Sequence, residues 1–357
     1  MMQNKGIVQK ALSNIELHED LNEIRSKIED ESLYCFLYYS LTMHTLFRNL
    51  VNVILKEYKY ILLPKEFGTL HHLQEITLST PYDVNTTQFA WEWLEQASMR
   101  NNLKSLKIMH YGLPELPLQI TCLKNLQLLD ISDNKIEFLP KELGTLSHLV
   151  FLNLSSNHLG RSRCNTWEWL EQAAVRNKMT QLHLSNNQLT ELSPQIGKLN
   201  ALTILKLDTN KLTCLPQSLA FLKNLKELDV YNNDLLYLPG NMAHLSVYID
   251  VDENPFNWND NEDYEVPSLF NCSADVIEKS RMKYKNKLPG SLIRYLDNEK
   301  YCNFCGTPCF RYYEKRFVNF TQYYERLYVQ FRGSPNIMNA SFECYACSSE
   351  CANILLF

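Results

Sequence analysis

The chain lacks the short motifs that mark most nucleotide-binding and hydrolytic enzymes. Neither a P-loop nor a G-x-G-x-x-G, G-x-S-x-G or H-E-x-x-H sequence occurs in its 357 residues. An excess of basic residues is also missing, because 35 Lys and Arg residues are outnumbered by 40 Asp and Glu residues. The net charge of −5 provides no attractive field for nucleic acid. We therefore expect neither an enzyme nor a nucleic-acid-binding protein.

Little in the sequence resembles a targeting or membrane segment. Residues 1–30 are polar and charged, which does not fit a secretory signal. The most apolar window, residues 33–55, contains His44 and Arg48. Such groups cost about 2–3 kcal/mol or more each at the middle of a bilayer, so a packed helix is favoured over a membrane span. We expect a protein of the cytoplasm or nucleus without a membrane partner.

One phrase, L-x-x-L-x-L-x-x-N-x-L, recurs through residues 73–256. Its copies begin at Leu73, Leu103, Leu126, Leu149, Met179, Leu202 and Leu225, and a last, weaker copy ends at Phe256. Successive starts lie 30, 23, 23, 30, 23 and 23 residues apart. A period of this size indicates a solenoid. Each L-x-L piece is then a short strand whose leucines stack on those of the next coil.

The phrase carries asparagine at its turn position. An Asn side chain both donates and accepts hydrogen bonds, so it can satisfy backbone groups that no sheet ladder reaches. The predicted ladder consists of Asn134, Asn157, Asn187, Asn210, Asn233 and Asn254. After the turn, Leu-Pro sequences such as Leu139-Pro140 lead the chain back along the convex side. The phrase resembles that of leucine-rich-repeat proteins, which implies an α/β repeat solenoid of about eight repeats over residues 61–258.

The two 30-residue units contain nearly the same insert. The sequence W-E-W-L-E-Q-A occupies residues 91–97 and recurs at residues 167–173, 76 residues later. This offset equals one long and two short units, which indicates that a block of three repeats was duplicated. Trp167, Leu170 and Ala174 are spaced as one face of a helix, so we expect a helix on the convex side.

Non-repeat segments flank the array on both sides. Leu21, Ile24 and Ile28 have helical spacing, and residues 1–60 are predicted to form a helical cap. Terminal repeats need such a cap because their leucines would otherwise face water. Residues 259–299 are expected to form a linker and two short helices, and residues 300–357 a cysteine-rich tail.

The two short helices after the repeats carry apolar residues in a defined order. The first has Leu269 and Ile277, and the second reads L-P-x-x-L-x-x-x-L over residues 288–296. The pair resembles the box by which substrate receptors bind elongins B and C and a cullin-2 scaffold. In that family the first half is S/T/P-L-x-x-x-C-x-x-x-Φ, and Ser273 stands here in place of the Cys.

That resemblance implies a substrate receptor of a cullin-2 ubiquitin ligase. Elongin C would be bound by Leu269 and Ile277. The cullin would be bound by Leu288, Pro289, Leu292 and Leu296. One alternative is that both helices only cover the end of the solenoid, because apolar positions at helical spacing are common. Another is an interaction scaffold that binds signalling proteins and has no role in a ligase.

The tail carries two groups of cysteines. The first contains Cys302, Cys305 and Cys309, and the second contains Cys344, Cys347 and Cys351. Two such knuckles fit a tetrahedral four-cysteine zinc ribbon, whose closed site is structural, and they indicate a reducing compartment. Spacing alone favours Cys344 and Cys347 for the second pair. The resembling receptors have C-S-x-x-C there, which implies Cys302, Cys305, Cys347 and Cys351 as ligands, with Cys309 and Cys344 as alternatives. Metal removal is expected to unfold the tail and to leave the repeats folded.

Side chains between the inward leucines are predicted to point to the concave face of the sheet. Leu128 and Phe151 are adjacent and apolar there, as anchors of a protein interface often are. The acidic residues Asp208, Asp229, Asp250 and Asp252 favour a basic segment on the partner. The substrate-binding candidates are Leu128, Asp130, Phe151, Ile204, Asp229 and Tyr231. A solvated face without a partner is the alternative.

Overall fold

A computed structural model describes most of the repeat region and parts of the tail. The described residues are 51–56, 63, 65–79, 91–161, 167–256, 274, 277, 288, 290–297, 300–309, 314–319, 330–331 and 340–355. The chain divides into two compact units, Met1–Leu184 (unit 1) and Ser185–Phe357 (unit 2). Leu269, Pro289 and nearly all of the predicted N-terminal cap lie outside the described residues.

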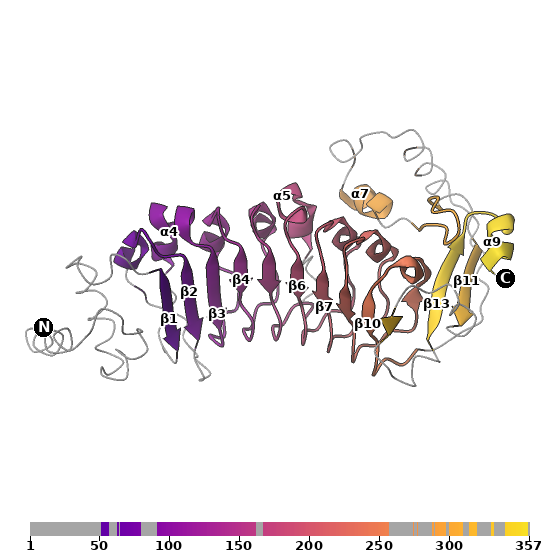
Figure 1. Cartoon of the computed structure of the whole chain (residues 1–357), viewed down its shortest axis with the longest axis horizontal. Coiled ribbons are helices and arrows are strands. Elements are labelled where there is room, and N and C mark those ends of the chain that lie inside the picture. Colours follow the sequence, from indigo (N-terminus) through magenta and orange to yellow (C-terminus); the bar gives the residue numbers. More distant parts are fainter. Residues whose placement is uncertain are drawn as a thin grey trace, which may run out of the picture. The chain divides into compact units, whose positions relative to one another are not determined.

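Unit 1 is built on a parallel sheet of short strands (Figure 1). Its strands, in spatial and chain order, are β1 (Asn52–Lys56), β2 (Glu75–Ser79), β3 (Ser105–Met109), β4 (Leu128–Asp130), β5 (Phe151–Asn153) and β6 (Gln181–His183). Leu128 pairs with Phe151, so one strand follows the next by one period of the phrase. The central leucines of these strands, such as Leu129 and Leu152, are fully buried. The repeated leucines therefore form the core, as the sequence predicts.

β1 corrects the predicted boundary of the N-terminal cap. The cap was expected to be helical as far as residue 60, but Asn52–Lys56 is a strand that pairs in parallel with β2. Asn52 pairs with Glu75, which lies 23 residues later. The missed signal is a further copy of the phrase, Leu50-x-x-Val53-x-Leu55, one period before Leu73.

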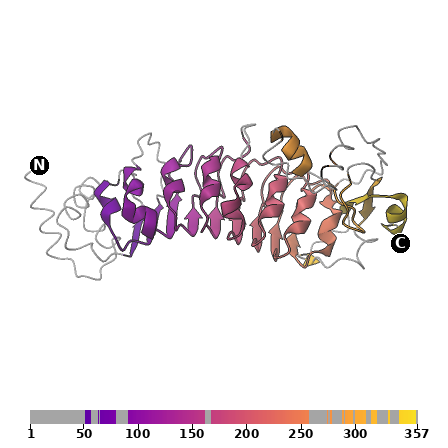
Figure 2. The ribbon, with the colours of Figure 1, turned by 90° about the horizontal axis from the view of Figure 1, so that it is seen from above.

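The return segments of unit 1 are short helical turns. They are η1 (Lys65–Thr69), η2 (Glu92–Glu95), α4 (Ala97–Asn102), η3 (Leu118–Cys122), η4 (Lys141–Thr145), η5 (Glu168–Glu171) and α5 (Ala173–Arg176). Figure 2 shows these turns following one another along the unit. Pro117 and Pro140 directly precede η3 and η4, and their φ angles of −59° and −69° suit entry into a helical turn.

The two tryptophan inserts have the same structure, as expected for a duplicated block. Trp93 and Trp169 are both fully buried. A Cβ added at Gly144 would stand 2.0 Å from the carbonyl oxygen of Trp169, and a Cβ added at Gly68 would stand 2.2 Å from the carbonyl oxygen of Trp93. The expected single helix is wrong in one respect. Extended backbone at Gln172 (φ −73°, ψ 129°) separates η5 from α5, so Ala174 is exposed and its neighbour Val175 is buried instead.

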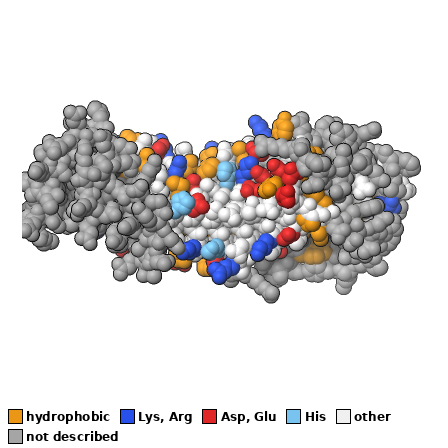
Figure 3. Space-filling view, turned by 90° about the horizontal axis from the view of Figure 1, so that it is seen from below, with side chains coloured by type: hydrophobic (Ala, Val, Ile, Leu, Met, Phe, Trp, Pro, Cys, Tyr) orange, Lys and Arg blue, Asp and Glu red, His pale blue; other side chains and the backbone are white. Residues whose placement is uncertain are grey.

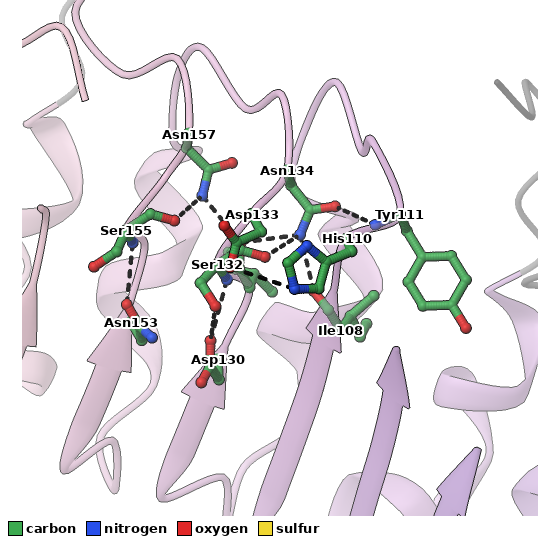
Figure 4. Close-up of polar contacts among 11 residues, drawn as sticks. Ile108, His110, Tyr111, Asp130, Ser132, Asp133, Asn134, Asn153, Ser155 and Asn157 are labelled. Carbon is green, nitrogen blue, oxygen red and sulfur yellow. Dashed lines mark hydrogen bonds and ion pairs between the residues drawn. The ribbon is translucent and has the colours of Figure 1, made fainter. Parts of the chain in front are cut away.

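The asparagine ladder is present in both units, and Figure 4 shows its first two members. The Asn134 carboxamide oxygen accepts the backbone N–H groups of Tyr111 and Leu113 at 3.2 and 3.1 Å. Its Nδ2 donates to carbonyl oxygens of Ile108, Ile131 and Ser132. Asn157, Asn210, Asn233 and Asn254 accept from the previous coil in the same way. The predicted role of these side chains is confirmed.

Unit 2 continues the repeat pattern and adds the tail. One parallel sheet has the order β7 (Ile204–Lys206), β8 (Glu227–Asp229), β10 (Tyr248–Asp250) and β12 (Gln330–Phe331). A second sheet has the order β11 (Glu314–Asn319), β13 (Ser341–Ala346) and β9 (Leu238–Pro239). The helical segments are η6 (Pro194–Lys198), η7 (Gln217–Phe221), η8 (Gly240–His244), α7 (Gly290–Asp297) and α9 (Ser349–Leu355).

The tail joins the repeats through both sheets. β12 pairs in parallel with the last repeat strand, β10, and β13 pairs in parallel with β9 of the last return segment. Each pairing provides hydrogen-bond partners for backbone N–H and C=O groups that the edge of the final repeat would otherwise leave unpaired. The tail is therefore part of the C-terminal closure of the repeats and does not form a detached module.

Candidate functional site

Four cysteines of the tail converge on one point. The Sγ atoms of Cys302, Cys305, Cys347 and Cys351 all lie within 4.8 Å of one another. The Sγ of Cys347 stands 3.5 Å from that of Cys305 and 3.7 Å from that of Cys351. Four thiolates around a tetrahedral zinc ion, with Zn–S bonds of about 2.3 Å, would be separated by about 3.8 Å. The donor set and its spacing therefore fit a zinc ion.

The first cysteine pair is placed by a tight backbone turn. Cys302 accepts a hydrogen bond from the N–H of Gly306 and donates its own N–H to Thr307, both at 2.9 Å. Gly306 has a φ of +71°, a conformation that favours glycine. Asn303 fastens the turn to β13, because its N–H donates to the Tyr345 carbonyl and its Oδ1 accepts the Tyr345 N–H, each at 2.7 Å. The turn thus directs both sulfurs toward the second pair.

The second cysteine pair lies where β13 ends and α9 begins. Cys347 directly follows the strand, and Cys351 lies in the first turn of α9. The Ser348 hydroxyl accepts the N–H of Cys351 at 3.2 Å, which stabilises the start of the helix. Strand end and helix start together bring the two sulfurs to the same side.

The thiols of this region differ in their readiness to ionise. The Thr307 hydroxyl lies 3.2 Å from the sulfur of Cys305, and this hydrogen bond lowers the pKa of Cys305 to about 6. Burial raises the pKa of Cys309 to about 12, with a further contribution from the neighbouring thiols Cys302, Cys305 and Cys351. Cys305 is therefore poised to be a thiolate ligand, while Cys309 favours the neutral thiol.

The two alternative ligands, Cys344 and Cys309, are not part of the four-sulfur group. Cys344 is fully buried, and its sulfur faces Gly240, where an added Cβ would stand 2.5 Å from it. Cys309 packs with Cys302 and Tyr345 in a small apolar cluster, and its thiol lies 3.6 Å from the Thr307 carbonyl oxygen. The structure therefore gathers the four cysteines that the family resemblance implies, and not the pair that spacing alone favours.

Buried polar contacts attach the tail to the return segments. Glu343 of β13 is 6% exposed, and it meets the Lys315 ammonium group at 3.0 Å and the Gln217 amide. Asn241 donates to the Tyr301 carbonyl oxygen at 3.1 Å, and the Phe221 and Tyr301 rings meet edge to face at 4.8 Å. A groove of about 390 Å³ lies between these return segments and the first cysteine pair.

The described residues of the predicted elongin and cullin box pack mainly on one another. Ala274 and Leu296 form a small buried cluster, and Ile277, Leu288 and Tyr295 pack against it. Leu296 is only 3% exposed, and its expected role as a cullin contact stays a prediction. Leu292 lies in α7 as expected. The structure brings Ile277, Leu288 and Leu296 together, and binding by the rest of the box stays a prediction.

A salt bridge that no sequence pattern indicates fixes α7 to the repeats. The Asp297 carboxylate accepts from the Lys198 ammonium group at 2.8 Å and from the Gln195 amide at 2.5 Å. Its side chain is 7% exposed, so this pair is well shielded from water. Single charged residues in helices carry no signature of a partner about 100 residues away in the chain, so no local pattern could have identified the contact.

The outward sheet face of unit 1 carries the predicted apolar pair. Leu128 and Phe151 lie directly opposite each other on β4 and β5, and both are partly exposed. The Phe151 ring also meets the His183 ring edge to face at 5.0 Å. Asp130 is turned toward its own loop, where it accepts from the N–H and hydroxyl of Ser132 at 3.1 and 2.7 Å.

The outward face of unit 2 is more acidic. Ile204 and Asp229 are partly exposed, and Tyr231 is 40% exposed. The Lys206 ammonium group lies 2.5 Å from Glu227 and 3.2 Å from Asp229. Partial burial disfavours the charge on Lys206, but the hydrogen bonds to these two carboxylates outweigh it and raise the lysine pKa. The sequence candidates are thus accessible on the sheet faces, and their role in binding stays a prediction.

No helix in the described part of the chain has both the length and the apolar character that a bilayer crossing requires. If the four cysteines bind a metal ion together, all four positions of a tetrahedral site are filled and none is left for a substrate. The expectation of a non-enzymatic protein stays a prediction.

Comparisons with known proteins agree with the repeat architecture. Family models described as leucine rich repeats match residues 177–235 and residues 125–146. A leucine-rich-repeat protein of Leptospira interrogans is 26% identical, with a TM-score of 0.51, over 61% of this chain and 52% of that one. This chain therefore matches about half of the Leptospira protein. Comparison with curated protein sequences gives no match.

Two larger assemblies show weaker similarity. The first is the structure of the Toll–Spätzle complex of Drosophila. The match covers 60% of this chain and 31% of the matched chain of that complex, with 22% identity and a TM-score of 0.47. The second is the ectodomain of the plant receptor kinase GASSHO1/SCHENGEN3 of Arabidopsis thaliana in complex with a CASPARIAN STRIP INTEGRITY FACTOR. The match covers 57% of this chain and 26% of the receptor chain, with 24% identity and a TM-score of 0.39. The family models and the Leptospira structure support the conclusion that this chain carries leucine-rich repeats.

Proposed function

We propose that the protein is an interaction module that holds a protein partner on the outward faces of its repeat strands. The observation that carries this proposal is the exposure of large apolar side chains on a sheet whose core is already complete. Leu128, Phe151 and Ile204 are partly exposed, and Tyr248 is 56% exposed. None of these side chains is needed to fill the core, and apolar and aromatic groups in such places are typical interface anchors.

We further propose that the bound partner is a substrate and that residues 259–299 link it to elongins B and C and to cullin-2. The resemblance of the two-helix box is the basis of this step. The clustering of Ile277 and Leu288 around Leu296 supports a box that folds as one helical unit, and the Asp297–Lys198 salt bridge supports a fixed position on the repeats. A fixed linker would hold a substrate at a constant distance from the ligase.

Co-expression with tagged elongins B and C tests this assignment. The full chain is expected to co-purify with the elongins, and replacement of Leu269 and Ile277 by glutamate is expected to abolish the association. Leu118→Glu is the matched control, because Leu118 is 58% exposed and lies far from the box in the chain. Elongin binding that persists in the Leu269→Glu/Ile277→Glu variant would refute the assignment.

A structural zinc ion held by Cys302, Cys305, Cys347 and Cys351 belongs to the same proposal. A zinc ion with four thiolate ligands supplies cross-links between distant segments and no reactive position. Here it would tie the turn after α7 to the junction of β13 and α9. Reduced thiols are maintained in the cytoplasm and nucleus, so these compartments stay our prediction.

A scaffold without a ligase role is the second candidate, and the burial of Leu296 favours it. If α7 and the tail only close the end of the repeats, their apolar residues need no external partner. This candidate predicts that the Leu269→Glu/Ile277→Glu variant keeps its protein partners and leaves their cellular abundance unchanged. Partner accumulation in cells that express the variant would favour the ligase role.

A further inference from the structure

Nine outward side chains of unit 2 form a face of three rows, which we call the acidic face. The first row is Ile204, Glu227 and Tyr248, the second is Lys206, Asp229 and Asp250, and the third is Asp208, Tyr231 and Asp252. The first two rows follow the register of β7, β8 and β10, and the third lies two residues beyond. Every one of the nine is partly or largely exposed.

The acidic face carries a strong excess of negative charge. Its five carboxylates are opposed by one ammonium group, that of Lys206. Lys206 is already shared between Glu227 and Asp229. Asp229 stands directly opposite Asp250 in the sheet, and like charges in such cross-strand pairs destabilise a sheet. Figure 3 shows acidic side chains gathered beside hydrophobic ones in this part of the chain.

The fold requires the shape of these aspartates but not their charge. Asp229 Oδ1 accepts the N–H of Tyr231 at 3.2 Å, and Asp250 Oδ1 accepts that of Asp252 at 3.3 Å. In unit 1 the equivalent bond, at 3.0 Å, is made by the neutral side chain of Asn153. An asparagine would therefore close the same turn without the cross-strand repulsion. The turn hydrogen bonds of Asp229 and Asp250 therefore do not require the negative charge of these side chains.

An apolar recess lies at the edge of the same face. A cavity of about 320 Å³ is lined by Thr203, Ile204, Lys226, Glu227 and Tyr248. Tyr248 is 56% exposed and Tyr231 is 40% exposed, although neither is needed in the core. Its lining includes one carboxylate, that of Glu227, and one ammonium group, that of Lys226, and its aromatic wall suits an apolar side chain.

We propose that the acidic face binds a basic segment of the partner protein, with Lys or Arg side chains over Asp229, Asp250 and Asp252 and one apolar side chain in the recess between Ile204 and Tyr248. This inference rests on the proposed interaction role of the sheet face and is independent of the ligase role. Charge complementarity selects the occupant, because an acidic or neutral segment would add to the repulsion between the aspartates.

Peptide binding to the full chain tests the charge requirement. The probe is a fluorescently labelled peptide of alternating leucine and arginine, compared by anisotropy with a peptide in which glutamate replaces each arginine. Asp229→Asn/Asp250→Asn removes two charges and keeps both turn hydrogen bonds. Asp234→Asn/Glu168→Gln is the matched control, because it removes two exposed charges outside the face.

The expected outcome is an affinity of the arginine peptide that falls at least about tenfold in Asp229→Asn/Asp250→Asn and less than about twofold in the control. Binding should weaken with added salt, and the glutamate peptide should not bind. Equal affinity for wild type and Asp229→Asn/Asp250→Asn would overturn the inference. An equal loss in both double variants would also overturn it, because it would indicate attraction to net charge alone.

A second pair of changes tests the recess. Tyr248→Ser in the protein and serine in place of leucine in the peptide should each weaken binding, and the two losses should not add, because both remove the same contact. Full additivity would show that the recess does not hold the apolar side chain. A protein that still co-purifies with elongins but does not bind the arginine peptide would overturn this inference and leave the proposed function standing.

Discussion

Replacement of Asn134 by alanine isolates the contribution of one member of the asparagine ladder. Asn134 is 5% exposed, and its Oδ1 accepts the N–H group of Tyr111 (Figure 4). The same oxygen accepts the N–H group of Leu113. Alanine leaves both buried donors without an acceptor, at a cost of about 1–3 kcal/mol each. The expected loss of unfolding free energy is therefore about 2–6 kcal/mol.

Hydrogen exchange measures this loss where it arises. Repeat proteins need not unfold in one step, so a single global free energy is a poor measure for this chain. In Asn134→Ala the amides of Tyr111 and Leu113 should exchange much faster than in the wild type, while amides of unit 2 keep their rates. Asn125→Ala is the control, since Asn125 is exposed and makes one hydrogen bond, to the Asn101 carbonyl oxygen.

Two results would refute this reasoning. One is a loss below about 1 kcal/mol, which is the size of an ordinary exposed hydrogen bond. The other is unchanged protection of the Tyr111 and Leu113 amides. Asn134→Asp adds a further check, because it keeps the acceptor but loses the donor Nδ2 that serves three carbonyl oxygens. It should restore the Tyr111 and Leu113 protection only in part.

Three further predictions concern unit 2. Cys347→Ser and Cys351→Ser should each abolish stoichiometric zinc binding, measured by atomic emission of the purified protein, whereas Cys344→Ser should retain the zinc. Loss of zinc in Cys344→Ser alone would contradict the ligand set. A double-mutant cycle of Asp297→Asn and Lys198→Met should give a coupling free energy of about 0.5–3 kcal/mol, and a coupling of zero would show that the pair does not fix α7. The raised pKa of Lys206 favours the charged amine in the folded state, so the stabilisation by Lys206 is complete below its ordinary pKa of 10.5 and is lost as the pH rises through the raised value. The free energy of unfolding of the wild type, measured with urea, should therefore fall above pH 10.5 relative to that of Lys206→Met. Parallel pH dependences of the two proteins would refute the pairing.

The repeat core was predictable because its information is local and recurrent. A leucine such as Leu152 is buried by the same neighbours in every coil, so one phrase predicts strand, core and turn together. Asn157 follows the same logic, because its partners lie at fixed offsets in the chain. β1 was missed where the phrase weakens, and Ala174 was misplaced because a single extended residue, Gln172, interrupts the helical spacing.

The attachments of the tail were not predictable, because they join residues far apart in the sequence. Glu343 and Gln217 meet across 126 positions, and neither lies in a recurring pattern. The choice among the cysteines shows the same limit. Spacing alone favoured Cys344, but Cys344 lies within β13, where its sulfur faces Gly240 of the last return segment. The orientation of β13 determines which cysteine sulfurs point toward the first pair, and the number of residues between two cysteines does not predict that orientation.

Metal removal is the point at which the sequence and the structure make opposite predictions. The sequence treats the tail as a module whose unfolding spares the repeats. In the structure β13 pairs with β9 and β12 pairs with β10, so the last repeats share backbone hydrogen bonds with the tail. A structural zinc ion contributes about 10–16 kcal/mol to the folding of small domains. Its loss should therefore release these pairings.

Hydrogen exchange before and after chelation distinguishes the two predictions. Amides of β9 and β10 should lose protection when a chelator removes the metal, while amides of β3, β4 and β5 should keep it, because those strands pair only with other repeats. Full protection of β9 in the chelated protein would contradict the structure-based expectation and return the tail to an independent module. A loss limited to β9 and β10 would show that the metal completes the end of the repeat array.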